Sequence, residues 1–443
     1  MNPSHFVAVV GGACAGSEIA HGLAELGMEV AVFEQNPLPY GKIEDGLPIW
    51  HEKLQIREKK NIDTKLSHPN IHFVPSCKLG EDVTLVKLRG DLGLPLVVLA
   101  TGAWRDRGLR VDGIDAVTDD SFLYQNPLVY WFNHQHEANF SGRTYRIEPG
   151  AAVIGGGLAS IDVAKICMFE LTKRAAAEHG VTCDLLHMEH KGIFSELERH
   201  GLDFAQLGIQ PARLFYRKRI IDMPLVPMPD NPSEDKLAKA EKVRIKLIDN
   251  CRRKYGFEVH ELRSPTAVEV VDGGIRKLTL GVNQYKDGRF SATGETETIA
   301  CRQIISSIGS IPEEIKGVAM RGELYDTDNA FTGELAADPG VYLVGNAITG
   351  RGNIKDSMKN AQRLSKVVTA NINGDAVDFE QLFKSQAELA KESVAKLEAY
   401  LKGISPQSEE QQATARDAVK KLQEERGYGG DFATWRDQVL AAR

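Results

Sequence analysis

Two stretches of the chain share one pattern, in which an apolar run ends in glycines and is followed by residues with helical periodicity. The first is FVAVVGGACAGSEIAHGLAELGMEVAVFEQ, residues 6–35, and the second is AAVIGGGLASIDVAKI, residues 151–166. Short apolar runs that are rich in β-branched residues and bounded by glycine are typical of buried parallel strands. The pattern therefore predicts two strand–turn–helix units of the dinucleotide-binding type.

The first unit contains a candidate site for a pyrophosphate and an adenosine ribose. Its glycines allow a tight turn and close packing of the helix on the strand, and the helix N-terminus faces a pyrophosphate. Ala13 replaces the middle glycine of the G-x-G-x-x-G pattern, and its methyl group narrows the approach of the diphosphate. Glu34 ends the following strand, where a carboxylate accepts hydrogen bonds from ribose hydroxyls. The candidate residues of this unit are Gly11, Gly12, Ala13, Gly16 and Glu34.

The second unit is expected to bind the nicotinamide cofactor through Gly155, Gly157, Leu158 and Ser160. We predict that the next strand covers 183–188 and ends beside the adenosine ribose, at Glu189, His190 and Lys191. Glu189 would bond a free 2′-hydroxyl and favour NAD. His190 and Lys191 would instead hold a 2′-phosphate and favour NADP. Both cofactors stay open, with NAD preferred.

Three further apolar runs predict how the two units are joined. The run at 97–103 ends in Thr101 and Gly102, the run at 304–309 repeats that pattern, and the run at 341–346 ends in Gly345 and Asn346. Small residues at such strand ends allow a flavin's ribitol and phosphate to approach closely. We therefore predict an α/β fold with two Rossmann-like domains, in which the NAD(P) domain is inserted into a discontinuous FAD domain. The expected boundaries are 1–105 and 311–374 for the FAD domain, 106–310 for the NAD(P) domain, and 375–443 for a C-terminal helical extension.

Composition and charge narrow the class of protein. With 443 residues, two to three domains are expected. The formal net charge of −7 argues against a nucleic-acid binder. No apolar run approaches the roughly 20 residues of a membrane span, and the first apolar run is already a predicted strand rather than a signal peptide, so we expect a cytoplasmic location. None of the six cysteines forms a CxxC pair, which argues against a redox disulfide, and no metal site is expected.

In the order of its motifs, the chain resembles the adrenodoxin-reductase-like flavoproteins, including ferredoxin–NADP reductases of that type and, more distantly, the small subunit of glutamate synthase. The resemblance covers nearly the full length. Beyond the two glycine turns it is carried by Tyr40-Gly41-Lys42, His51, Gly80 to Thr84, the Ala-Thr-Gly turn, Arg263-Ser264-Pro265, Ser306 to Gly309, Arg351-Gly352 and the tail at Phe432 to Trp435.

The resemblance implies an FAD-dependent oxidoreductase that transfers a hydride between NAD(P)H and FAD, and single electrons between FAD and a ferredoxin-like iron–sulfur protein. His51 matches a family histidine beside the flavin ring and is the candidate catalytic residue; a surface histidine is an equal alternative. The segment that follows Gly345 differs from the family's tryptophan and Gly-Pro-Thr-Gly run, and in it Asn353 and Ile354 are further candidate FAD contacts.

Two questions about partners stay open. Ferredoxins are acidic, and Arg213, Arg217, Lys218 and Arg219, followed by a basic helix that Ser233 caps, would attract one. A solvated helix face is the alternative explanation. The chain could also be the NAD(P)H-reactive subunit of a larger complex, such as a 2-oxoacid oxidoreductase or a glutamate synthase-like enzyme. The helical tail either packs on the FAD domain or docks on another subunit.

Overall fold

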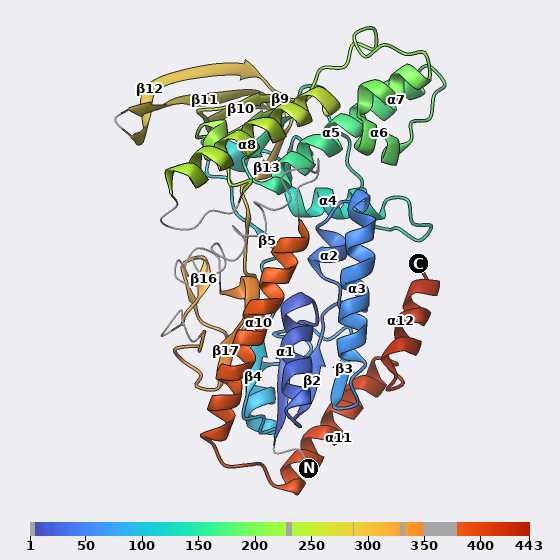
Figure 1. Ribbon diagram of the computed structural model, residues 1–443, viewed down its shortest axis with the longest axis vertical. Helices are drawn as coiled ribbons and strands as arrows, with labels where there is room; N and C mark the ends of the chain where they lie inside the picture. Colours follow the sequence, from blue (N-terminus) through green and yellow to red (C-terminus); the bar gives the residue numbers. More distant parts are fainter. Residues whose placement is uncertain (1–4, 227–232, 287, 328–332, 349–378) are drawn as a thin grey trace.

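The computed structural model describes residues 5–226, 233–286, 288–327, 333–348 and 379–443. Two five-stranded parallel sheets form the two ends of the molecule, one built around each glycine turn (Figure 1). The predicted architecture, with one dinucleotide-binding domain inserted in another and a helical C-terminal part, is confirmed. The exact domain boundaries stay a prediction.

The first sheet has the order β17-β4-β1-β2-β3, and all of its strand pairs are parallel. Strand β17 comes from the far end of the chain and pairs with β4, which closes the discontinuous domain. Every residue of β1 is at most 4% exposed, because helices cover both faces of the sheet. The strands are β1 (Phe6–Val10), β2 (Glu29–Phe33), β3 (Ile71–Val74), β4 (Val97–Leu99) and β17 (Val341–Leu343).

The second sheet has the order β6-β13-β7-β8-β9, again with parallel pairs only. Its strands are β6 (Phe122–Tyr124), β7 (Ala152–Gly155), β8 (Arg213–Phe215), β9 (Glu258–His260) and β13 (Ile304–Ser307). A three-stranded antiparallel sheet lies beside it and consists of β10 (Arg263–Val271), β11 (Gly274–Lys286) and β12 (Arg289–Ala300).

A short antiparallel pair connects the two domains, since β5 (Arg105–Asp106) leaves the first domain and β14 (Ser310–Ile311) returns to it. A second small pair is formed by β15 (Met320–Arg321) and β16 (Leu324–Tyr325). Short helical turns occur at η1 (Ile49–His51), η2 (Lys87–Asp91), η3 (Ile114–Ala116), η4 (Ile220–Asp222) and η5 (Gly345–Ala347).

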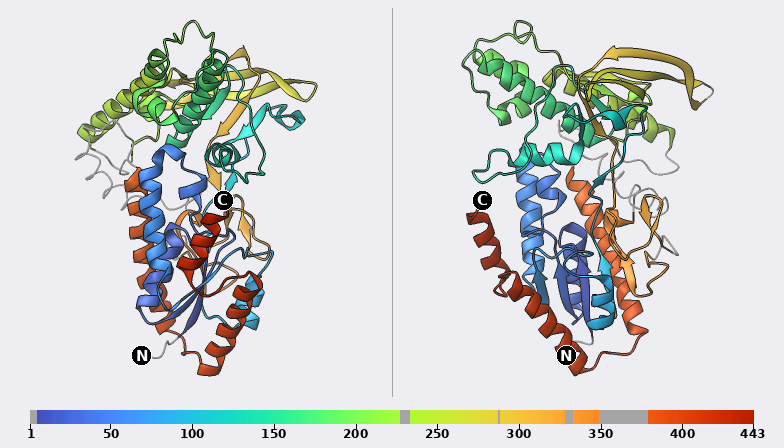
Figure 2. Two further views of the ribbon diagram at one scale, coloured as in Figure 1. Left: turned by 90° about the vertical axis from the view of Figure 1, so that its right-hand side faces the viewer. Right: turned by 180° about the vertical axis from the view of Figure 1, so that it is seen from behind.

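The helices divide between the two domains, as the three views show (Figures 1 and 2). Those of the first domain are α1 (Cys14–Glu25), α2 (Lys42–Asp45) and α3 (Glu52–Leu66). Those of the second are α4 (Gln125–His134), α5 (Leu158–Ala177), α6 (Leu185–Lys191), α7 (Ile193–Arg199) and α8 (Glu234–Tyr255). The C-terminal helices are α10 (Phe379–Lys402), α11 (Glu409–Glu425) and α12 (Phe432–Ala441).

The C-terminal helices pack on the first domain of their own chain. Leu397 and Leu401 of α10 join the core formed with α1, while Val419 of α11 joins the core on the opposite face of the sheet. Trp435 of α12 donates a hydrogen bond to the carbonyl of Pro37 over 2.7 Å. Of the two arrangements expected for the tail, the structure therefore has the intramolecular one.

Within the described residues, no helix is both long and apolar enough to cross a membrane. The cytoplasmic location stays a prediction.

Shortening the apolar contact between α10 and α1 should destabilise the first domain. Leu397 is 2% exposed, and Leu397→Ala should lower the free energy of unfolding by about 2–5 kcal/mol, because it removes buried methyl groups and leaves a cavity. The exposed Leu440 of α12 provides a matched control, since Leu440→Ala should change it by about 0.5 kcal/mol or less. Urea unfolding measures both, and equal midpoints for the two variants would contradict this packing.

Candidate functional site

The first glycine turn holds α1 directly against β1 and β4. Gly11 has a φ of +94°, a conformation that side-chain-bearing residues rarely adopt. A Cβ atom on Gly16 would lie 1.7 Å from the carbonyl oxygen of Gly11, so only glycine permits this approach of helix and strand. The N-cap residue of α1 is Ala13, whose methyl group offers no acceptor to the helix N-terminus. The turn thus has the shape of a cradle for a phosphate group.

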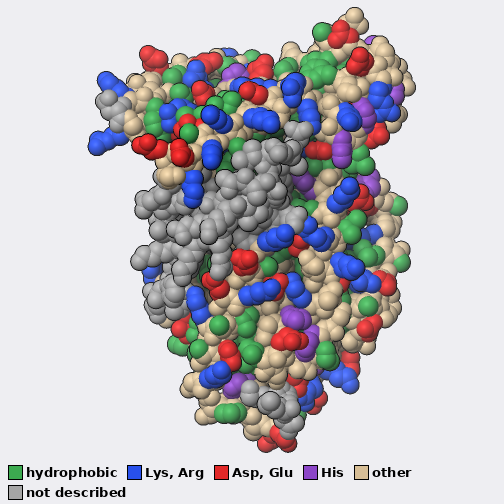
Figure 3. Space-filling view, viewed as in Figure 1, with side chains coloured by type: hydrophobic (Ala, Val, Ile, Leu, Met, Phe, Trp, Pro, Cys, Tyr) green, Lys and Arg blue, Asp and Glu red, His purple; other side chains and the backbone are tan. Residues whose placement is uncertain are grey.

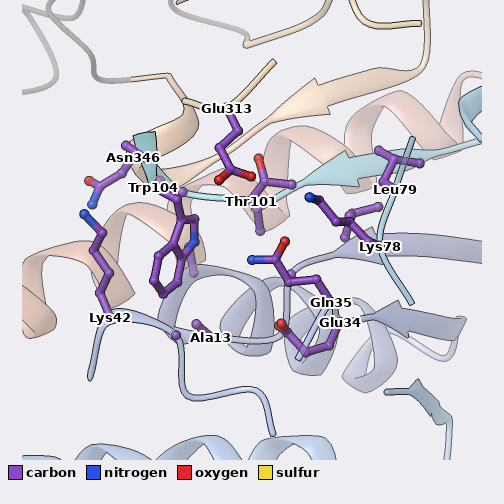
Figure 4. Close-up of a pocket in the computed structure, with 18 of the residues that line it drawn as sticks. Ala13, Glu34, Gln35, Lys42, Lys78, Leu79, Thr101, Trp104, Glu313 and Asn346 are labelled. Carbon is purple, nitrogen blue, oxygen red and sulfur yellow. The ribbon is translucent and has the colours of Figure 1, made fainter. Parts of the chain in front are cut away.

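A cavity of about 410 Å³ opens at this turn and runs along the carboxyl edge of the first sheet (Figure 4). That volume lies in the usual range of cofactor sites. Seven of the predicted FAD-binding residues line it: Gly11, Ala13, Glu34, Thr101, Gly102, Gly345 and Asn346. Gly12 and Gly16 lie behind this lining, and Asn353 and Ile354 fall outside the described residues.

Glu34 is at one end of the cavity and is 5% exposed. Its two carboxylate oxygens accept hydrogen bonds from the backbone N–H groups of Gly12 (2.9 Å) and Asn36 (3.0 Å). Burial outweighs these two donors and raises the pKa of Glu34 to about 7. The acid thus lies where an adenosine ribose is expected, and main-chain donors hold it in place.

Most of the residues that line this cavity were not predicted, and Lys42, Trp104, Gln125 and Ala159 are among them. Lys42 and Trp104 come from the first domain, whereas Gln125 begins α4 and Ala159 is in the first turn of α5, directly after the second glycine turn. The lysine and the tryptophan follow no dinucleotide pattern, and only the packing of the two domains brings Gln125 and Ala159 to this cavity. One cavity is therefore shared by both nucleotide-binding units.

The second glycine turn has the predicted strand–turn–helix form. It ends β7 and opens α5, with Gly157 as the N-cap residue and Leu158 as the first helical residue. Ser160 is fully buried, and its hydroxyl donates to the carbonyl of Gly157 over 2.6 Å. A Cβ atom on Gly155 would lie 2.7 Å from that of Ser160, so the serine packs directly against the strand.

The strand predicted over 183–188 is wrong, because this segment forms the helix α6. The side chain of Asp184 caps that helix by accepting hydrogen bonds from the N–H groups of Leu186 and His187, and Gly192 ends it with a φ of +100°. Both signals were present in the sequence. Glu189, His190 and Lys191 consequently lie on a helix rather than at a strand end.

The strand that follows α5 in the sheet is β8, and the residues after it are Tyr216, Arg217 and Lys218. The Tyr216 ring lies over the glycine turn, since a Cβ atom on Gly156 would be 2.2 Å from two of its ring carbons. The end of β8 is thus adjacent to the second glycine turn. This is the position in the sheet at which the predicted strand 183–188 was expected to end. Its basic residues occur where Glu189, His190 and Lys191 had been predicted.

Two of the four basic residues predicted to attract a partner make contacts within the protein. The Arg213 guanidinium donates to the carbonyls of Gly150 and Ala300, each over 2.9 Å. Arg219 pairs with Asp222 over 2.8 Å. These two side chains are held by the second domain itself, so the predicted patch of four does not form one free basic surface.

His51 lies at the junction of the domains. Its Nε2 atom accepts a hydrogen bond from the Trp50 indole over 3.0 Å and is 3.6 Å from the carboxylate of Asp162. Asp162 and Lys165 are buried side chains of α5, and the ammonium of Lys165 is 3.1 Å from Glu189 and 4.3 Å from the Trp50 ring centre. His51 is not part of the cavity lining, and its catalytic role stays a prediction.

Comparisons with known proteins agree with this arrangement. No family model matches the chain. It is 26% identical over 347 residues to the mitochondrial NADPH:adrenodoxin oxidoreductase of Salvelinus fontinalis, and 28% identical over 179 residues to that of Arabidopsis thaliana. These alignments cover 68% and 40% of this chain, and 65% and 35% of the relatives. A probable ferredoxin/ferredoxin–NADP reductase of Mycobacterium tuberculosis is 28% identical over 180 residues, 40% of this chain and 30% of that protein.

The chain thus spans less than two thirds of the length of these curated relatives. Among solved structures, FprA of Mycobacterium tuberculosis in complex with NADPH superposes with a TM-score of 0.65 at 21% identity, covering 96% of this chain and 91% of that chain. The predicted resemblance to the adrenodoxin-reductase-like flavoproteins is confirmed. The likeness to FprA also shows that this fold extends over nearly the whole chain.

The pKa of Glu34 predicts a pH dependence of stability. In the folded protein this pKa is about 7 against an ordinary value of 4.5, so Glu34 favours the folded state below pH 4.5 and this contribution is lost as the pH rises through 7. Between pH 5 and pH 8 the ligand-free protein should lose on the order of 2 kcal/mol relative to Glu34→Gln.

Urea unfolding at several pH values measures this difference. Glu52→Gln, at an exposed glutamate in the first turn of α3, is the matched control and should show no such trend relative to the wild type. A constant difference between wild type and Glu34→Gln across this pH range would contradict the raised pKa.

Proposed function

We propose that this protein is an FAD-dependent NADPH oxidoreductase, which transfers a hydride between NADPH and FAD and single electrons between FAD and a ferredoxin-like iron–sulfur protein. One observation carries the proposal: the cavity at the first glycine turn is also lined by Ala159, directly after the second turn, and by Gln125. Two nucleotide sites that open into one cavity can bring a nicotinamide and a flavin into contact.

The residues of the first site fit FAD. The Glu34 carboxylate, a hydrogen-bond acceptor, lies at the end of the cavity that suits the adenosine. The turn at Gly11 and Gly16 leaves room for a diphosphate, and Gly345 and Asn346 line the cavity beyond this turn. Strand β4 ends beside them at Thr101 and Gly102, so the cavity wall there consists of main chain and small side chains. Such a wall allows a ribitol chain to pass close to the sheet.

When bound, the two cofactors supply the hydride transfer, and the protein has to align them and exclude water. Trp50, from the first half of the chain, is buried in the core of the second domain against Phe132 and Phe169. Asn133 of α4 donates to the carbonyls of Glu44 and Leu47 over 2.8 and 2.7 Å. These contacts hold the two domains in one relative position, which is what alignment of two rings requires.

The end of β8 favours NADPH over NADH, in contrast to the preference inferred from Glu189. Arg217 and Lys218 follow Tyr216, the residue after β8 whose ring lies against the second glycine turn. Their main chain is held in place, since Asn283 donates to the carbonyl of Arg217 and Leu262 donates to that of Lys218. Two basic side chains next to the ribose site would bind a 2′-phosphate.

Anaerobic stopped-flow absorbance tests the proposal and the cofactor choice together. NADPH should bleach the flavin band of the purified protein faster than NADH. Arg217→Gln combined with Lys218→Gln should raise the KM for NADPH roughly 10- to 100-fold and leave that for NADH nearly unchanged, since charge-assisted hydrogen bonds to a phosphate are lost. Lys191→Gln, on α6, is the control and should leave both KM values unchanged.

A larger effect of Lys191→Gln than of the double variant would contradict the assignment to β8. A protein that cannot be reconstituted with FAD would contradict the proposed function itself.

We place the docking surface for an acidic iron–sulfur protein on α8. Lys239, Lys242, Lys246 and Arg253 are exposed and share one side of this helix, where they outnumber the exposed acids Asp235 and Asp249. Ala240 and Ile248 are buried on the opposite side. Lysine and arginine side chains lie along α8 on the face of the molecule shown in Figure 3. A positive stripe on a protein with a net charge of −7 would steer an acidic partner to the second domain.

Charge reversal on α8 should slow electron transfer to a ferredoxin without affecting a small acceptor. Lys239→Glu with Lys242→Glu should lower kcat/KM for an acidic ferredoxin roughly tenfold at low salt, and less at high salt. Ferricyanide reduction should be unchanged. The exposed pair Lys420→Glu with Lys421→Glu on α11 is the matched control. Equal losses in the two double variants would exclude α8 as the docking surface.

A further inference from the structure

Lys42 is a half-buried lysine at the wall of the shared cavity. Its ammonium donates to the Ser310 hydroxyl over 2.9 Å and to the side-chain oxygen of Asn126 over 3.2 Å, and lies 5.7 Å from the centre of the Trp104 ring. Among the described residues, no carboxylate is within ion-pair distance of this ammonium. The carboxylate that acts on its charge from farther away is that of Asp106. Lys42 is therefore a cation held by neutral groups.

The position of Lys42 identifies which end of a bound dinucleotide it faces. In Figure 4 Lys42 and Glu34 lie on opposite sides of Ala13, which belongs to the phosphate cradle. Since the Glu34 end suits the adenosine, the flavin ring would occupy the end formed by Lys42, Trp104 and Asn346. Ser310 and Asn126 belong to the β14 link and to α4, so this is also the end at which the two domains meet.

A positive charge at this end has a chemical consequence. Uptake of a hydride adds two electrons and one proton to the neutral flavin ring, which leaves the ring system with one net negative charge. A nearby cation lowers the free energy of that charged form more than that of the neutral form, and a low-dielectric site enlarges the difference. Carboxylates nearby have the opposite effect.

We propose that Lys42 is a positioning residue for the flavin that raises its reduction potential and that Asp106 moderates this effect, an inference that rests on the proposed function. Asp106 does not form an ion pair with the ammonium. Its carboxylate accepts a hydrogen bond from the backbone N–H of Asn126 over 3.3 Å, which keeps the carboxylate close to Lys42. The two residues thus act on the same charge with opposite signs.

The ionisation of both groups is compatible with this role at pH 7. Burial lowers the pKa of Lys42 to about 8, against the opposing influence of Asp106, so the ammonium form prevails. Burial raises the pKa of Asp106 to about 6, and the charge of Lys42 counteracts that rise, so the carboxylate form prevails. Each of the two groups is the charged neighbour that shifts the pKa of the other.

The experiment is an anaerobic spectroscopic redox titration of the flavin-loaded protein at pH 7 against a reference dye. Lys42→Gln keeps an N–H donor for Ser310 and Asn126 but removes the charge. It should lower the equilibrium constant for two-electron reduction about tenfold, a potential roughly 30 mV more negative. Lys42→Arg should restore most of the wild-type potential, whereas Asp106→Asn should shift the potential in the positive direction.

A second lysine in the same cavity provides the matched control. Lys78 lines the opposite end with Gln35 and pairs with Glu81. Lys78→Gln removes the same charge from the same cavity, and it should change the equilibrium constant by less than about twofold because the distance to the ring is larger.

The outcomes separate this inference from the proposed function. An unchanged potential in a flavin-loaded Lys42→Gln protein, or equal shifts for Lys42→Gln and Lys78→Gln, would overturn the role of Lys42 and leave the proposed function standing. If Lys42→Gln does not retain flavin, the redox titration of Asp106→Asn tests the inference instead. An unchanged or more negative potential in that variant overturns the inference. Absence of flavin binding by the wild type would instead overturn the proposed function.

Discussion

The close contact between α1 and the first sheet is the constraint on which the candidate site depends. Because Gly16 lies against the carbonyl of Gly11, the helix N-terminus comes within reach of whatever occupies the cavity. The same approach leaves Glu34 buried at the end of β2, where its charge is costly unless donors surround it. The shape of the cavity and the surroundings of Glu34 thus both depend on the absence of side chains at the first glycine turn.

A second constraint is the fixed relation between the two domains. Within the described residues, the polypeptide crosses between the domains only at the short strand pair β5 and β14. On one side of that link, the contacts of Trp50 and Asn133 hold the domains together. The buried charges of Asp162 and Lys165 belong to the same contact, since the Trp50 ring covers Lys165, which also pairs with the partly exposed Glu189. Asp162 also lies 3.6 Å from His51 of the first domain, so separating the domains would remove both the ring over Lys165 and this neighbour of Asp162.

The first nucleotide site followed from local pattern, whereas the second did so only in part. Strand, glycines and terminal acid are adjacent in sequence around Gly11 and Glu34, and local patterns of this kind report local structure well. In the second domain two helices, α6 and α7, separate α5 from its next strand, and the short apolar run at 183–188 resembles a strand. The cap at Asp184 is the signal that distinguishes a helix from a strand here.

The sequence by itself determined the two strand–turn–helix units and the buried acid after β2, because each depends on residues close together in the chain. Their nesting also followed from the order of the apolar runs, although it is completed by β17 pairing with the distant β4. Only the tertiary structure decided which side chains share the cavity. Lys42, Gln125 and Ala159 are far apart in sequence and meet because the domain link brings the N-terminal ends of α4 and α5 to the cavity at the edge of the first sheet. The placement of the tail also depended on the tertiary structure. The apolar stripe of α10 could pack on any apolar surface, and in the folded chain it packs on α1.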